Sequence, residues 1–218
     1  MYGTRLPDGL YAITDSVCTP PASLCLQVEQ AIQGGARVIQ YRDKQATAAQ
    51  RRQRATALLA LCRTLRVPLI INDDLELAAA IGADGVHLGE HDGTAAQART
   101  RLGSQALIGV SCYDRLQRAE QAQADGASYV AFGRFFPSHS KPAAPHAPVA
   151  LLTEARRRLA LPIVAIGGIT PHNGATLVRA GANLLAVIHG VFCSADSRGA
   201  AAQYAALFTA PDAMTHRA

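Results

Sequence analysis

The sequence has no tryptophan, only two methionines, and no long uninterrupted hydrophobic run. A membrane-spanning helix needs about 18 or more consecutive apolar residues, and no stretch meets that requirement. The first residues include Arg5 and Asp8, and no apolar segment with a small-residue cleavage site follows them. We therefore expect a cytoplasmic protein with no membrane partner.

Cysteines are few and widely spaced. They form no Cys-x-x-Cys pair and no grouping with histidine along the chain, and the chain is long enough to fold without disulfides. We expect reduced thiols that fill the core, and no zinc site. The five cysteines are Cys18, Cys25, Cys62, Cys112 and Cys193.

Lysine is also scarce, although the formal net charge is +5. Arginine supplies most of the positive charge, it is spread along the chain, and few aromatic residues accompany it, so nucleic-acid binding is not indicated. The only lysines are Lys44 and Lys141. A compact ammonium acts differently from a guanidinium, which hints that these two positions have a specific task.

Short apolar runs alternate with longer segments of helical period, such as residues 46–65 and 115–124. Most runs are apolar on both faces, which is typical of parallel strands covered on both sides. The pattern predicts one compact domain over residues 1–218, a (β/α)₈ TIM barrel with a frayed tail from about residue 210. An open doubly wound sheet is the alternative, but no Gly-x-Gly-x-x-Gly turn follows the first run. The eight runs are residues 10–14, 38–41, 69–72, 86–88, 107–110, 129–132, 163–166 and 184–188.

Polar residues follow several of these runs, where a barrel of this kind has its active site. Arg42, Lys44 and Lys141 offer charges that suit phosphate oxygens. Asp73 and Asp92 follow neighbouring strands and offer hard oxygens for one Mg²⁺. These residues also have structural alternatives, because the cations can pair with nearby aspartates and Asp92 can cap a helix.

The last two runs end in Gly168 and in Ile188-His189. Barrels often bind a phosphate through backbone N–H groups at this position. Two anion sites with a metal beside one of them suggest a diphosphate substrate and a second, monophosphorylated substrate.

The ordered set of motifs resembles that of the thiamine phosphate synthase family over nearly the whole chain. The motifs are Tyr11-Ala12-Ile13-Thr14-Asp15, Gln40-Tyr41-Arg42-Asp43-Lys44, Ile71-Asn72-Asp73-Asp74, Val86-His87-Leu88-Gly89 followed by Asp92, Gly133-Arg134-Phe135-Phe136, Ser140-Lys141-Pro142 and Ala165-Ile166-Gly167-Gly168-Ile169-Thr170. The resemblance implies transfer of a hydroxymethylpyrimidine group from its diphosphate to a thiazole phosphate, which gives thiamine monophosphate and pyrophosphate. It also implies one Mg²⁺ per active site, held by Asp73 and Asp92.

The resemblance implies three further groups of residues. Those that bind the pyrimidine diphosphate are Gln40, Arg42, Lys44, Asn72, Ser111 and Lys141, of which Arg42, Lys44, Ser111 and Lys141 are the catalytic ones. The expected substrate-binding set also includes Tyr41 and Asp43, which lie in these motifs, and His139, which directly precedes the Ser140-Lys141-Pro142 motif. Those that hold the thiazole phosphate are Ser138, Ser140, Gly168, Ile188 and His189, where His189 stands in place of a more usual serine.

Two other functions remain open at this point. One is an isomerase related to thiazole tautomerase, which would need neither the metal nor the diphosphate residues. The other is a catalytically silent phosphate-binding barrel. The sequence leaves the oligomeric state open, with a homo-oligomer as one option.

Overall fold

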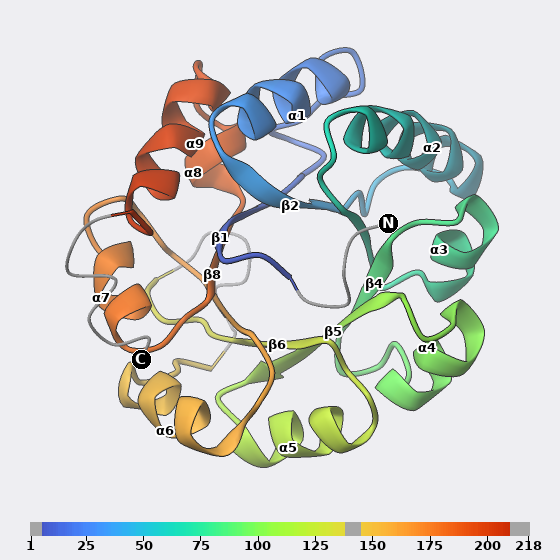
Figure 1. Ribbon diagram of the computed structural model, residues 1–218. Helices are drawn as coiled ribbons and strands as arrows, with labels where there is room; N and C mark the ends of the chain where they lie inside the picture. Colours follow the sequence, from blue (N-terminus) through green and yellow to red (C-terminus); the bar gives the residue numbers. More distant parts are fainter. Residues whose placement is uncertain (1–5, 138–144, 210–218) are drawn as a thin grey trace.

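The structure is a computed structural model that describes residues 6–137 and 145–209 (Figure 1). Its strands form a closed ring in which each strand pairs in parallel with the next, and β8 pairs with β1. The strands are β1 (Gly9–Ile13), β2 (Ala36–Tyr41), β3 (Leu69–Asn72), β4 (Gly85–Leu88), β5 (Leu107–Tyr113), β6 (Tyr129–Phe132), β7 (Ile163–Ile166) and β8 (Leu184–Val187). The predicted (β/α)₈ TIM barrel is confirmed.

Helices surround the strands on the outside of the ring (Figure 1). They are α1 (Leu24–Gln33), α2 (Ala48–Thr64), α3 (Leu75–Ile81), α4 (Ala95–Leu102), α5 (Leu116–Ala124), α6 (Ala150–Arg158), α7 (Gly174–Arg179), α8 (His189–Phe192) and α9 (Ser197–Ala206). Among the described residues, none of these helices has both the length and the apolar character needed to span a membrane.

Side-chain hydroxyls and glycine set several helix ends. Thr94 begins α4 with a capping box, in which its side chain accepts from the N–H of Gln97 and the Gln97 side chain accepts from the N–H of Thr94. The alternative in which Asp92 caps this helix is therefore wrong, and its carboxylate is available for another role. Gly82 ends α3 in the left-handed conformation, with a φ of 65°, as its place after a helix predicts.

The alternation of side chains divides the core into two layers. Residues that point outward from the strands pack against the helices, and those that point inward fill the barrel. On β2, for example, Val38 and Gln40 point inward, whereas Ile39 and Tyr41 join the outer layer. The same alternation directs polar residues near the carboxyl ends of the strands into the mouth of the barrel.

Candidate active site

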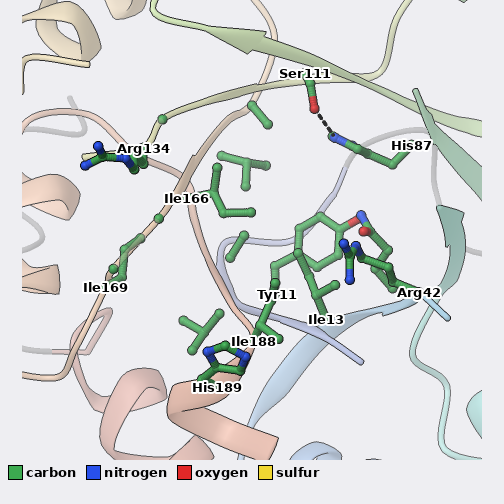
Figure 2. A pocket seen from close by; sticks show the side chains of 18 of the residues that line it. Tyr11, Ile13, Arg42, His87, Ser111, Arg134, Ile166, Ile169, Ile188 and His189 are labelled. Atoms are coloured by element: carbon green, nitrogen blue, oxygen red, sulfur yellow. Dashed lines mark hydrogen bonds between the residues drawn. The ribbon is translucent and has the colours of Figure 1, made fainter. Parts of the chain in front are cut away.

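A cavity of about 330 Å³ opens at the carboxyl ends of the strands (Figure 2). Its walls come from every strand or from the loop that follows it, so the whole ring contributes to one site. Of the residues predicted from the sequence, those that line it are Gln40, Arg42, Asn72, Asp73, Ser111, Gly168, Ile188 and His189.

The floor of the cavity is a chain of hydrogen bonds between polar side chains. The Gln40 Nε2 donates to the Tyr11 hydroxyl at 2.9 Å, and the hydroxyls of Tyr11 and Tyr129 lie 2.8 Å apart. The Tyr129 hydroxyl also lies 3.1 Å from His87 Nδ1, and His87 Nε2 lies 2.9 Å from Ser111 Oγ. The chain thus connects Gln40 on β2 to Ser111 on β5 across the inside of the barrel.

Burial keeps the two tyrosines of this floor neutral. Tyr11 and Tyr129 are almost fully buried, and loss of solvation raises the pKa of both hydroxyls far above their ordinary value. Gly109 makes room for the Tyr129 ring, since a Cβ at this position would lie 2.0 Å from the Tyr129 Cζ. The two tyrosines are therefore uncharged, and the hydrogen-bonded floor presents Gln40 and Ser111 to the cavity in fixed positions.

The rim of the cavity on the β2 to β4 side carries charged groups. The Arg42 guanidinium pairs with Asp15 at 3.2 Å, and the Lys44 ammonium lies 3.4 Å from Asp73 Oδ2. The Lys44 side chain is 58% exposed, so its pairing with Asp73 is loose and a ligand with stronger charge can replace it. The sequence anticipated the structural pairing of Lys44 with Asp73, whereas the partner of Arg42 is Asp15.

Asp73 and Asp92 converge around Gly89. The Gly89 N–H donates to Asp92 Oδ2 at 2.8 Å, and a Cβ at Gly89 would lie 2.6 Å from that oxygen and 3.9 Å from Asp73 Oδ1. Burial and the facing carboxylate of Asp73 raise the pKa of Asp92 above its ordinary value. Asp73 has a φ of 63°, a left-handed conformation that costs energy outside glycine and is common at functional sites.

Gly168, Ile188 and His189 line the wall of the cavity after β7 and β8. Figure 2 shows Ile188 and His189 next to each other in this wall. Gly168 has a φ of 63°, and a Cβ there would lie 2.2 Å from the Pro137 carbonyl oxygen. Only glycine fits this turn, which brings the backbone close to the cavity. The three residues predicted to hold a phosphate are thus brought together.

The structure does not bring every predicted side chain to the cavity. Tyr41 points outward into the core beneath the helices, and Asp43 pairs with Arg54 at 2.6 Å and accepts from the backbone N–H groups of residues 45 and 46. Tyr41 and Asp43 alternate along the chain with Gln40 and Arg42, which line the cavity. The side chains of Tyr41 and Asp43 therefore face away from it. We leave Tyr41 and Asp43 out of the proposed substrate-binding set. Ser138, His139, Ser140 and Lys141 lie outside the described residues.

Sequence analysis missed three residues of the floor, Tyr11, His87 and Tyr129. Each lies on the inward side of its strand, so the alternation along β1, β4 and β6 carried a signal for them. Their role depends on contacts across the barrel between residues 29 to 118 positions apart. No local motif reports such contacts.

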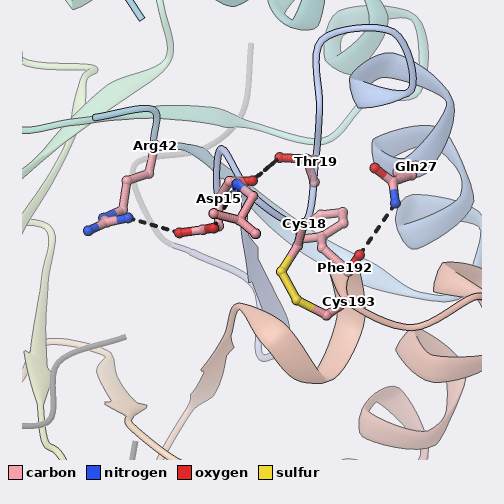
Figure 3. Close-up of a disulfide and its surroundings, with 8 residues drawn as sticks. Asp15, Cys18, Thr19, Gln27, Arg42, Phe192 and Cys193 are labelled. Carbon is pink, nitrogen blue, oxygen red and sulfur yellow. Dashed lines mark hydrogen bonds and ion pairs between the residues drawn. A yellow bond between two sulfur atoms is a disulfide. The ribbon is translucent and has the colours of Figure 1, made fainter. Parts of the chain in front are cut away.

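The expectation of reduced cysteines throughout is corrected. Cys18 and Cys193 form a disulfide, with their Cα atoms 4.8 Å apart (Figure 3). They are separated by 175 residues and meet because β1 closes the ring against β8, which spacing along the sequence does not reveal. Cys62 and Cys112 are buried thiols, as expected, and Cys25 is an exposed thiol.

The family model for thiamine monophosphate synthase matches residues 10–191 of the chain, which include the cavity-lining strands. The chain belongs to the thiamine monophosphate synthase family. A thiamine-phosphate synthase of Nitrosococcus oceani is 54% identical over 196 residues, covering 90% of this chain and 90% of the relative. One of Thiobacillus denitrificans is 52% identical over 205 residues, covering 94% and 96% of the two chains.

The fold of this family member is also that of a solved relative. A structure named thiamine phosphate pyrophosphorylase from Pyrococcus furiosus superposes with a TM-score of 0.82 at 30% sequence identity, covering 92% of this chain and 95% of the other. The family, the barrel and the curated relatives together identify this protein as an enzyme of the thiamine monophosphate synthase type.

Proposed function

We propose that the protein joins a hydroxymethylpyrimidine diphosphate to a thiazole phosphate, releasing pyrophosphate and forming thiamine monophosphate. The single observation that carries this proposal is the division of the cavity into three parts. A charged rim, a hydrogen-bonded floor and a glycine-rich wall face one another. These parts match a diphosphate, an uncharged aromatic ring and a second phosphate.

The residues at the rim fit one Mg²⁺. Asp73 and Asp92 follow neighbouring strands, face each other closely enough to raise the pKa of Asp92, and surround a glycine that leaves the space between them open. Two carboxylates with waters and phosphate oxygens form the oxygen shell that Mg²⁺ prefers. When bound, the ion would neutralise charge on the diphosphate and on the departing pyrophosphate.

Arg42 and Lys44 would share this task at the same rim, and we propose that Lys141 joins them. Negative charge grows on the diphosphate as its bond to the pyrimidine methylene carbon breaks. At an effective dielectric constant of about 20, a cation about 4 Å from a unit charge contributes about 4 kcal/mol before desolvation is subtracted. In the free protein Arg42 and Lys44 pair with the single carboxylates of Asp15 and Asp73. When the substrate is bound, its diphosphate would offer these two cations a more strongly charged partner.

We propose that the floor positions the pyrimidine through Gln40 and Ser111. Both side chains end the hydrogen-bonded chain, and their amide and hydroxyl groups suit the ring nitrogens and amino group of an aminopyrimidine. The neutral tyrosines prevent a full negative charge from forming next to the ring.

The thiazole phosphate would bind at the wall formed by Gly168, Ile188 and His189, joined by Ser138 and Ser140. The substitution is dissociative in this proposal. The C–O bond to the diphosphate breaks with its electron pair on oxygen, and the thiazole nitrogen then donates its lone pair to the methylene carbon to form the C–N bond. Holding both substrates in one cavity removes most of the entropic cost of this second step.

Turnover measurements test the proposal. Purified protein is incubated with both substrates, with Mg²⁺ or with EDTA, and thiamine monophosphate and pyrophosphate are quantified. We expect equal amounts of the two products with Mg²⁺ and neither with EDTA. Isomerisation of a thiazole phosphate that is insensitive to EDTA, or an absence of any turnover, would instead support the tautomerase-like or the silent alternative.

A further inference from the structure

The Cys18–Cys193 disulfide lies where the first and last units of the barrel meet. Cys18 belongs to the connection between β1 and α1, and Cys193 directly follows α8 (Figure 3). Cys18 is 9% exposed, whereas Cys193 is exposed to solvent. The proposed synthase reaction needs neither thiol, so the pair has no role in the function derived above.

A third side chain completes a group of potential metal ligands at this point. His189 begins α8 and Cys193 directly follows it, and the Cys193 N–H donates to the His189 carbonyl at 3.0 Å, so the two residues lie one helical turn apart. The ligand atoms of Cys18, His189 and Cys193 all lie within 4.8 Å of one another. The connection after β1 and the segment around α8 are far apart in sequence, and together they bring two sulfurs and an imidazole to one place.

The ligand chemistry differs from that of the aspartate pair at the other side of the cavity. Thiolate sulfur and imidazole nitrogen bind Zn²⁺ and related thiophilic ions, whereas Mg²⁺ prefers oxygen. Three protein ligands leave the fourth position of a tetrahedral ion for water. Since His189 also lines the cavity, the ion would be bound at the border of the active site.

Both elements that supply the ligands are held in place by contacts of their own. The Thr19 N–H donates to the Asp15 carbonyl at 2.8 Å, and the Asp15 N–H donates to Thr19 Oγ1 at 3.2 Å, which fixes the loop around Cys18. The Gln27 Nε2 of α1 donates to the Phe192 carbonyl of α8 at 3.3 Å (Figure 3). Little ordering is thus required when an ion binds.

We propose that Cys18, His189 and Cys193 form a Zn²⁺ site when the disulfide is reduced. A dithiol reductant supplies two electrons and two protons, breaks the S–S bond and becomes a cyclic disulfide itself. Zn²⁺ then displaces the two thiol protons and binds both sulfurs and the imidazole. The oxidised pair lacks thiolates, so disulfide formation and metal binding exclude each other at this site.

Cobalt absorption spectroscopy tests the proposal without relying on activity. The full chain is prepared oxidised, or reduced with dithiothreitol that is then removed, and titrated anaerobically with Co²⁺ followed by Zn²⁺. For the reduced protein we expect one equivalent of Co²⁺ with thiolate-to-cobalt charge-transfer absorption, displaced stoichiometrically by Zn²⁺. We expect no such absorption for the oxidised protein, which requires no substitution and so controls for folding.

Variants identify the ligands. Cys18→Ser and Cys193→Ser should each weaken Zn²⁺ binding by at least about 100-fold, more than loss of a group that only supports a ligand. Cys25→Ser is the matched control, because Cys25 is an exposed thiol outside the group, and it should bind like the unaltered protein. Charge-transfer absorption in the oxidised protein, equal binding after Cys193→Ser, or no binding by the reduced protein would each overturn the proposal.

Discussion

The floor and the rim of the cavity are built from different kinds of residue. The floor joins buried and half-buried polar groups through hydrogen bonds, and its residues are Gln40, Tyr11, Tyr129, His87 and Ser111. The rim holds Arg42 and Lys44 in partly exposed ion pairs with Asp15 and Asp73, and Asp92 lies beside Asp73. A buried network that is satisfied internally fixes positions, whereas exposed charges remain available to a charged ligand.

This difference between floor and rim indicates what each part of the cavity would contribute to the reaction. The floor would orient the pyrimidine for bond cleavage, while the rim would act mainly on charge that develops as the diphosphate leaves. Changes at the rim should therefore lower the rate strongly and alter the metal requirement. Changes at the floor should have smaller effects on rate and larger effects on stability.

Asp92→Asn should have the largest effect. The substitution keeps an oxygen for the Gly89 N–H but removes the carboxylate charge that we propose holds Mg²⁺. We expect kcat to fall by about 100-fold or more, together with a higher Mg²⁺ concentration for half-maximal rate. The measurement is the initial rate across a magnesium titration at saturating substrates.

The matched control is Asp114→Asn, which removes an exposed carboxylate from the end of β5. It should leave the magnesium titration within about twofold of the unaltered protein. An Asp92→Asn enzyme with an unchanged magnesium titration would refute the proposed role of Asp92.

Arg42→Gln should have the next largest effect. Loss of one charged hydrogen-bonding group at the rim should raise KM for the pyrimidine diphosphate or lower kcat, with about a 30-fold loss in kcat/KM. Steady-state kinetics with each substrate varied in turn would show whether the loss concerns the diphosphate. Arg115→Gln, which removes the partner of exposed Glu90, serves as control; equal kinetics in the two variants would contradict the special role of Arg42.

Tyr129→Phe should break the floor with a smaller effect on rate. It leaves the Tyr11 hydroxyl and His87 Nδ1 short of a partner in a buried place, which costs about 1–3 kcal/mol of unfolding free energy. We expect Tm to fall by about 5 °C and kcat by about tenfold. Differential scanning calorimetry and steady-state kinetics measure the two effects.

Tyr41→Phe is the control for the floor, because it removes a phenol hydroxyl from the outward face of β2. We expect its kcat to stay within about twofold of the unaltered protein. If Tyr129→Phe behaved in the same way, the floor would have no positioning role.

The smallest expected effect concerns pH and stability without metal. Because folding raises the pKa of Asp92, the folded protein holds this proton more tightly than the unfolded chain. Raising the pH from the ordinary pKa of an aspartate through the raised value should therefore lower the unfolding free energy. Urea unfolding in EDTA should show this loss in the unaltered protein and a smaller one in Asp92→Asn. If the unfolding free energy changed equally with pH in the two proteins, the assignment of this effect to Asp92 would be contradicted.

The sequence predicted the fold well because the barrel repeats a local pattern. All eight apolar runs correspond to strands, and β5 continues to Tyr113, so Ser111 lies within that strand instead of after it. Charged rim residues such as Arg42 and Asp73 could also be predicted from the sequence, since each directly follows a strand. Local order along the chain carries this information.

Contacts across the ring could not be predicted in the same way. Tyr129 meets Tyr11 and His87 only when the barrel closes, and Cys18 meets Cys193 only when β8 pairs with β1. Spacing in the sequence says nothing about such partners. Tyr41 and Asp43 belong to the same continuous motif as Gln40 and Arg42, but inward and outward residues alternate along it. The side chains of Tyr41 and Asp43 therefore point away from the cavity.

Calorimetric titration with pyrophosphate tests the division between rim and floor most directly. With Mg²⁺ present, the unaltered protein and Tyr129→Phe should bind pyrophosphate with similar affinity, whereas Asp92→Asn should bind it far more weakly. Omission of Mg²⁺ should reduce binding by the unaltered protein to the same weak level. Equal binding by all three proteins, with or without Mg²⁺, would contradict the proposal that Asp92 and Mg²⁺ hold the leaving group at the rim.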